Sequence, residues 1–177
     1  FEQITSTYSN IRIGEDAPNN GSYNVLLGVE AGKGGSADSC NLIGYRAGWY
    51  ATGVDRSTFI GTDAGLTGLD EDYTGFIGNR AGETGQYIGE TNAIGSNAAR
   101  LASSITGTNI IGRRAGMYAT GSLYNNIIGN RAGYSILNCD NNNMIGSYAG
   151  DNADGCDHNQ MIGSYAGRQS SGAFYSN

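Results

Sequence analysis

The chain has 177 residues, of which 38% are hydrophobic, 15% charged and 30 glycine, with one proline and a formal net charge of −6. Collagen needs a glycine at every third residue and abundant proline, so the composition excludes it. Nucleic-acid binding needs clustered Lys and Arg, so the acidic balance predicts no nucleic acid partner. No apolar run approaches the roughly 20 residues of a membrane span, and residues 1–6 lack signal-peptide regions. We therefore predict no membrane insertion.

Taken in chain order, the unit Ile-Gly-x-x-Ala-Gly recurs along almost the whole sequence. Two loose copies at Gly14 and Gly28 precede eight copies spaced by 17 residues, from Gly44 to Gly163. The residue before Gly is Ile in nine copies and Leu27 in the tenth, and the third residue after Gly is always Ala. The sequence thus predicts one repeat array over 1–177, and its ending within a repeat suggests a segment of a longer fibre.

The repeat predicts an all-β fold. A 17-residue unit is too short for a helical-hairpin repeat, and each glycine costs a helix about 0.5–1 kcal/mol. Short runs of Ile, Leu and Phe between Gly and Asn are typical of strands and turns. We predict a β-solenoid of about ten coils with a 17-residue period, a rod on the order of 50 Å long at ~4.8 Å per coil. The Asn three residues before Gly is expected to form a hydrogen-bonded ladder that closes a turn.

Each predicted strand ends in two consecutive apolar residues, which must point to opposite faces. We expect the later residue to fill the coil core, as Ile43, Ile60, Ile77, Ile94, Ile111, Ile128, Ile145 and Ile162. The earlier residue then forms an outward stripe of Leu42, Phe59, Phe76, Ile110, Ile127, Met144 and Met161. Monomers rarely expose such a stripe, so identical chains around an axis along the rod are expected to cover it, as a parallel homotrimer. In the alternative, both residues lie inside a wider single-chain coil; the residues do not dictate three-fold closure.

These repeats resemble the Asn-x-Ile-Gly-x-x-Ala-Gly arrays of bacteriophage tail fibres. They are also similar to the head repeats of trimeric autotransporter adhesins, where Asn-Ser-Val-Ala-Ile-Gly recurs. The resemblance spans residues 10–167 and implies a parallel trimer of β-solenoids in a virion tail fibre or on an extracellular surface. It further implies host attachment, with other fibre or virion proteins and a host cell-surface glycan or protein as partners. The period and the Arg and Tyr residues favour the phage fibre; a bacterial trimeric adhesin head and an extracellular filament are the alternatives.

An enzymatic alternative is weaker. The unit also fits the hexapeptide of left-handed β-helix acyltransferases, but those enzymes have three hexads per coil and this chain has one. Their catalytic histidine would have to be His158, in a polar turn. The acidic run Asp70-Glu71-Asp72 is expected to be a solvated loop, and no calcium-loop spacing is present. We predict no enzymatic activity, no cofactor and no metal site.

The 17-residue period predicts which cysteines lie close together. Cys139 and Cys156 are 17 residues apart, so they share a column in adjacent coils, whereas Cys40 falls outside it. Stacking brings their Cα atoms close to the 4.4–6.8 Å window of disulfides. The sequence leaves two alternatives for Cys139 and Cys156, a disulfide or two buried free thiols.

Aromatic and arginine residues are the binding candidates. Aromatic faces can stack on sugars or line a subunit seam, and the candidates for glycan contact are Trp49, Tyr50, Tyr118, Tyr134, Tyr148 and Tyr165. Arg46, Arg80, Arg114 and Arg131 share one column with Tyr148 and Tyr165. Because stacked like charges repel, these arginines are expected to pair with acids of a neighbouring coil or chain. Asp63 stands between Arg46 and Arg80 in that column.

Overall fold

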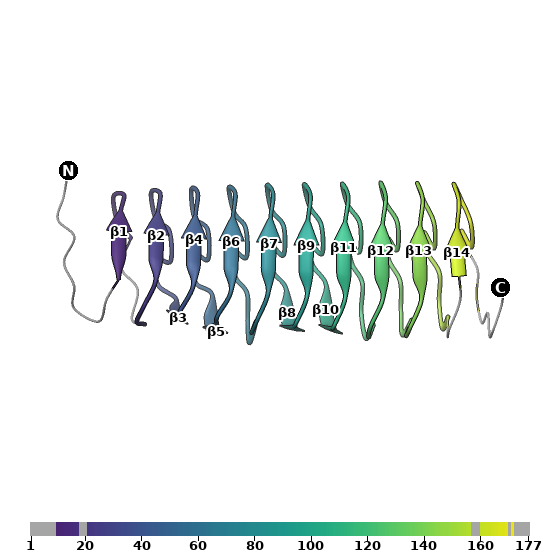
Figure 1. The fold of residues 1–177 in the computed structure, drawn as a ribbon, viewed down its shortest axis with the longest axis horizontal. Coiled ribbons are helices and arrows are strands. Elements are labelled where there is room, and N and C mark those ends of the chain that lie inside the picture. Colours follow the sequence, from purple (N-terminus) through teal and green to yellow (C-terminus); the bar gives the residue numbers. More distant parts are fainter. Residues whose placement is uncertain (1–9, 18–20, 157–159, 170, 172–177) are drawn as a thin grey trace.

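A computed structural model describes residues 10–17, 21–156, 160–169 and 171 as one long, narrow rod (Figure 1). Every regular element of this described part is a short strand. Its residues include no helix long and apolar enough to cross a membrane. The strands are β1 (Ile11–Ile13), β2 (Val25–Leu27), β3 (Ser36–Asp38), β4 (Asn41–Ile43), β5 (Thr52–Asp55), β6 (Thr58–Ile60), β7 (Gly75–Ile77), β8 (Gln86–Gly89), β9 (Asn92–Ile94), β10 (Ser103–Thr106), β11 (Asn109–Ile111), β12 (Asn126–Ile128), β13 (Asn143–Ile145) and β14 (Gln160–Ile162).

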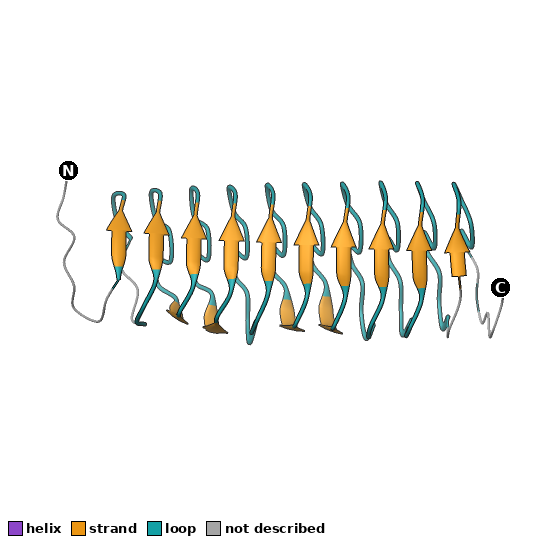
Figure 2. Ribbon diagram, in the orientation of Figure 1, coloured by secondary structure: helices purple, strands orange, loops and turns teal. Residues whose placement is uncertain are grey.

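Ten of the strands form one parallel sheet that runs the length of the rod (Figure 2). Their order is β1-β2-β4-β6-β7-β9-β11-β12-β13-β14. Each strand pairs with the equivalent strand one coil further on, without a register shift, as β11 does with β12. The predicted all-β solenoid with a 17-residue period is therefore confirmed, with ten strands joined by nine successive turns of chain.

A second, less regular ladder forms the other side of each coil. It consists of two short parallel sheets, β3-β5 and β8-β10. Isolated parallel bridges extend this ladder along the rod, from Thr52↔Leu69 to Asp154↔Ser171. The two sides enclose a narrow core.

Inward side chains from several positions of the repeat fill this core. The middle residue of most main strands is the largest contributor, and Phe59 and Phe76 stack at 5.0 Å between ring centroids. The exceptions are Arg12 in β1 and Ala93 in β9. The Ala of the repeat unit is buried as well, as at Ala115, and so are the residues seven and ten positions after the motif Gly, such as Ala102 and Ile105. This interior is larger than the sequence predicts, so each coil has an apolar core of its own.

Two glycine positions allow the coils to approach closely. At the end of the strand, Gly112 has a φ of +137°, and a Cβ there would overlap the carbonyl oxygen of Gly129 in the next coil. Four residues later, Gly116 has a φ of +58°, and a Cβ there would lie 2.8 Å from Cδ1 of Ile110. The first glycine admits the neighbouring backbone, and the second admits the large core side chain.

A column of buried polar residues closes the corner before each main strand. The amide groups of Asn125 and Asn142 donate to the carbonyl oxygens of Cys139 and Cys156, at 2.5 and 2.7 Å. Asn125 Oδ1 in turn accepts from the backbone N–H of Asn142 at 2.7 Å. The turn is therefore closed by the residue four positions before Gly, one position earlier than the sequence predicts.

Candidate functional site

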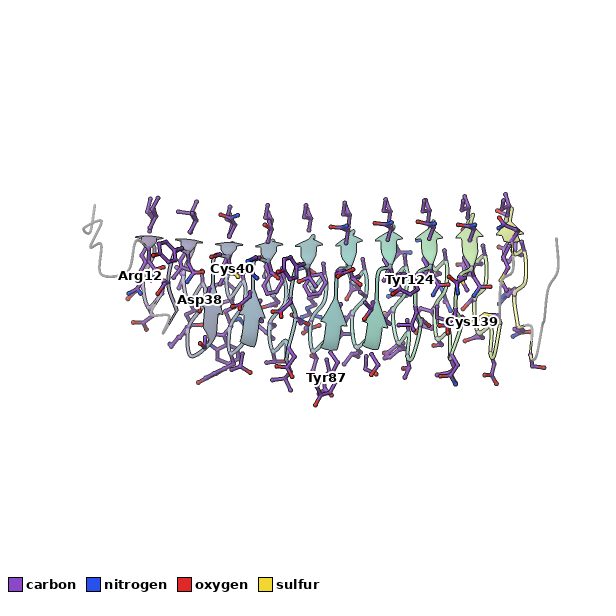
Figure 3. All side chains as sticks on the ribbon, turned by 60° about the horizontal axis from the view of Figure 1, so that its bottom comes forward. Arg12, Asp38, Cys40, Tyr87, Tyr124 and Cys139 are labelled. Carbon is purple, nitrogen blue, oxygen red and sulfur yellow. A yellow bond between two sulfur atoms is a disulfide. The ribbon has the colours of Figure 1, made fainter. Side chains whose placement is uncertain are left out.

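The outer face of the ten-stranded sheet is the most regular surface of the rod. Figure 3 shows a row of side chains projecting from this sheet along its whole length. The third residue of each main strand forms an isoleucine row, interrupted by Leu27 in β2, with Ile77, Ile94 and Ile111 each 41–42% exposed. Ten strands at ~4.8 Å spacing extend this row over roughly 43 Å.

The prediction of which apolar residue lies inside the coil is wrong. The predicted outward stripe, Leu42, Phe59, Phe76, Ile110, Ile127, Met144 and Met161, is buried within the chain's own coil, with every member at most 5% exposed. The predicted coil core, Ile43, Ile60, Ile77, Ile94, Ile111, Ile128, Ile145 and Ile162, lies on the outer face, half-buried or exposed. Strand alternation separates the two columns but does not say which one faces inward. The glycine four residues after the motif Gly decides this, because it leaves room for the earlier, bulkier residue.

A ladder of side-chain amides runs beside the isoleucine row. Asn92 donates to Asn109, Asn109 to Asn126 and Asn126 to Asn143, at 3.4, 3.2 and 2.9 Å. Asn143 continues the ladder to Gln160 at 3.2 Å. The predicted hydrogen-bonded Asn ladder is present, and it lies on the outer face beside the apolar row. The face therefore presents one apolar and one amide column in the same repeat.

The arginine column is partly neutralised. Asp63, which is buried, pairs with Arg46 at 2.9 Å and with Arg80 at 3.9 Å in the coils on either side, as the sequence predicts. Arg131 lies 3.5 Å from the buried carboxylate of Asp151. Arg114 is exposed, and no Asp or Glu of the described chain lies within 4.0 Å of its guanidinium. Along this column, Arg46, Asp63 and Arg80 alternate in charge, whereas Arg114 and Arg131 are two arginines in adjacent coils.

The six aromatic candidates fall into three neighbouring pairs. Tyr148 and Tyr165 stack at 5.1 Å, and Arg131 and Arg168 lie over their rings. The ring centroids of Trp49 and Tyr50 are 4.4 Å apart, and those of Tyr118 and Tyr134 are 5.5 Å apart, edge to face. One face of each of these two rings thus contacts the other ring, and Tyr165 remains 55% exposed.

Of the five most exposed tyrosines among the described residues, sequence reasoning missed four and named only Tyr165. Tyr23, Tyr73, Tyr87 and Tyr124 are 55–69% exposed, and Figure 3 shows Tyr87 projecting on the side away from the main sheet. All four have positive φ angles between 54° and 61°. The sequence signal was present, because glycine occupies the same columns in other coils, as at Gly107. A column that alternates between Gly and a large residue marks a left-handed corner, whose side chain projects outward.

Cys139 and Cys156 form a disulfide that links adjacent coils, with their Cα atoms 4.6 Å apart. The geometry thus resolves the alternative in favour of the bridge. Cys40 is a buried free thiol in the polar corner column, where its Sγ accepts from the backbone N–H of Ser57 at 3.4 Å. Burial raises the pKa of Cys40 to about 11, so this thiol is neutral near pH 7.

Glu71 departs from the expected solvated loop. Asp70 and Asp72 are exposed, but Glu71 is 0% exposed and takes the core position that Val54 and Ile88 occupy in the adjacent coils. Neither carboxyl oxygen has a hydrogen-bond partner. Gly68 and Gly85 provide the room, since a Cβ at Gly85 would lie 2.6 Å from Glu71 Oε1. Burial raises the pKa of Glu71 well above its ordinary value.

Among the described residues, no group of three or more His, Cys, Asp or Glu could hold a metal ion. His158, the acyltransferase candidate, lies outside the described residues.

The fold and this face define a parallel β-solenoid repeat protein with one continuous, regular outer surface. Comparison with known proteins gives no match: no family model, no curated protein and no solved structure matches the chain.

Proposed function

We propose that this chain is a structural and host-attachment segment of a homotrimeric phage tail fibre. The observation that carries the proposal is the exposed isoleucine row. Each coil already has its own core, so the outer Ile side chains add nothing to the coil interior, yet they recur at eight successive positions from Ile43 to Ile162. With Ile13 and Leu27 the row covers all ten strands and spans about 43 Å, which is more than a monomer ordinarily exposes.

A second copy of the same chain is the partner that fits the row best. Only a surface with the same coil repeat meets every isoleucine in the same way along the rod. Chains arranged parallel around an axis along the rod bring the rows together with matched spacing. The amide ladder at the edge of the face supplies hydrogen-bonding groups for the polar rim that such interfaces carry.

Solution mass tests this proposal. Sedimentation equilibrium at micromolar concentration is expected to give three times the chain mass of 18.4 kDa. Replacing Ile111 and Ile128 by Lys places two charges in the centre of the interface and is expected to yield monomer with an unchanged circular dichroism spectrum. The matched control places two lysines at Thr52 and Gln86, exposed strand positions of the second ladder, and is expected to remain trimeric.

A stable monomer of the unchanged chain would overturn the proposal, and a stable dimer would overturn three-fold closure. A trimer that survives the Ile111→Lys and Ile128→Lys substitutions would show that another surface holds the chains together.

A further inference from the structure

We propose that the turns carrying Arg113, Arg114 and Arg131 bind an acidic polysaccharide through its carboxylate groups. This inference deepens the proposed function, on which it rests, by naming the class of surface molecule that the fibre would contact.

The first observation is the uneven distribution of charge. The chain carries a net charge of −6, yet no acidic residue occurs between Glu90 and Asp140. The same stretch contains four arginines, Arg100, Arg113, Arg114 and Arg131. An acidic rod thus has one basic zone near its middle, which favours the approach of an anion there and disfavours it elsewhere.

The second observation is that half of this charge is not neutralised. Arg100 pairs with Glu83, and Arg131 pairs with Asp151 at 3.5 Å. Arg113 and Arg114 are exposed, and within the described residues neither has a carboxylate within 4.0 Å. Arg114 and Arg131 occupy the same column in adjacent coils, about one strand spacing (~4.8 Å) apart. Arg114 can donate to an external carboxylate, and Arg131 on the adjacent coil adds positive charge beside it.

The third observation is the aromatic surface beside the arginines. Tyr118 follows Arg114 on one turn, and Tyr134 follows Arg131 on the next. Their rings meet edge to face at 5.5 Å, and the Arg131 guanidinium lies 4.3 Å from the Tyr134 centroid. Tyr118 is 39% exposed. On these turns Tyr118 offers an apolar face for a sugar ring, and Arg114, on the same turn, offers a donor for the sugar's carboxylate.

Another Arg–Tyr pair on the rod does not combine an aromatic ring with an excess of positive charge. Arg56 donates to the Tyr73 hydroxyl at 2.7 Å and lies 5.2 Å from the centroid of that ring, so it forms a similar Arg–Tyr pair. However, Asp55 and Asp72 occupy the same and the adjacent coil, and an anion would be repelled there. This pair is therefore the matched control.

Biolayer interferometry with the full chain immobilised tests the proposal. The probes are polygalacturonate as the acidic polysaccharide, dextran as a neutral polysaccharide and poly-L-glutamate as a polyanion without sugar. We expect binding of polygalacturonate only. Arg114→Gln is expected to weaken it about tenfold, as loss of a charge-assisted hydrogen bond does, Tyr118→Leu to weaken it several-fold, and Arg56→Gln to change it less than twofold.

Absence of polygalacturonate binding would overturn the inference. If poly-L-glutamate binds as tightly as polygalacturonate, the site recognises negative charge and not a polysaccharide. If Arg56→Gln weakens polygalacturonate binding as much as Arg114→Gln does, the binding site does not lie on these turns. The solution mass distinguishes the two proposals. A trimer that binds no polygalacturonate would overturn only the polysaccharide site, and a monomer that binds polygalacturonate would overturn only the trimeric fibre.

Discussion

The two sides of the ten-stranded sheet carry similar residues in different settings. Phe76 and Ile77 are neighbours in the sequence, yet Phe76 is 0% exposed in the coil core and Ile77 is 41% exposed on the outer face. From β2 onward the inner column varies in size among Leu, Phe, Ala, Ile and Met, and β1 has Arg12 there, whereas the outer column is Ile in almost every coil. An inner residue adapts to its own coil. A uniform outer residue indicates a constraint that is the same at every coil, as contact with an identical rod would be.

Replacing each neighbour by Ala gives the largest expected contrast. Phe76→Ala leaves a cavity in a narrow core and is expected to lower the free energy of unfolding by about 3–5 kcal/mol at every protein concentration. Ile77→Ala removes an exposed side chain, so its cost is expected to appear only at concentrations where chains associate. Urea unfolding at several concentrations measures both. Equal losses at high dilution would contradict the contrast between the two columns.

On the inner side, the buried carboxyl of Glu71 makes the stability of the coil depend on pH. Burial raises the pKa of the Glu71 carboxyl well above its ordinary value of 4.5, so the folded chain keeps this proton to a higher pH than the unfolded chain does. Its contribution to stability is therefore fully present below pH 4.5 and is lost as the pH rises towards the raised folded pKa, by up to about 1.4 kcal/mol per pH unit.

The variant Glu71→Gln keeps the shape of the side chain and removes the titration. Unfolding free energies measured from pH 4 to pH 8 are expected to fall for the unchanged chain relative to Glu71→Gln. Asp72→Asn is the matched control, since Asp72 is exposed. In this variant the unfolding free energy is expected to fall with pH as it does in the unchanged chain. Parallel curves for the unchanged chain and Glu71→Gln would show that Glu71 is ionised in the fold.

Much of the architecture could be predicted from the sequence, because the 17-residue period specifies parallel stacking and in-register pairing by itself. The direction of each side chain could not be predicted from alternation alone, and the predicted outward stripe lies inside the coil for that reason. The sequence does contain the missing signal. Most strands have a large middle residue and a glycine six residues later; one coil has Ala93 and Ala99 instead. Because both positions change in the same coil, the middle residue of the strand and the residue six positions later contact each other. The middle residue therefore faces the coil interior.

The burial of Glu71 could not be predicted in this way. Glu71 occupies a core position only because Gly68 and Gly85 make room for it on either side. That compensation depends on three positions in two coils, and a single repeat column does not display it.

The pair Ala93 and Ala99 tests the packing of the inner column directly. Ala93→Ile alone is expected to overpack the coil and cost about 1–3 kcal/mol, because the Cβ of Ala99 occupies the space that glycine leaves open elsewhere. Adding Ala99→Gly is expected to recover most of this loss, as in the coil of Ile110 and Gly116. A double-mutant cycle of urea unfolding measures the coupling, which is independent of what Ala99→Gly does alone. Additive effects would contradict direct contact between the two positions.

The smallest contrast is between two neighbouring asparagines. Asn125 is buried, and its amide group donates to the Cys139 carbonyl at 2.5 Å, so Asn125→Ala leaves that carbonyl without a partner and is expected to cost about 1–3 kcal/mol. Asn126 belongs to the outer amide ladder, where water can replace its bond to Asn143, and Asn126→Ala is expected to cost about 0.5 kcal/mol or less. Thermal unfolding at high dilution compares the two. A larger loss for Asn126 would mean that the outer ladder stabilises the single coil, and the uniform outer face would then need no second chain to explain it.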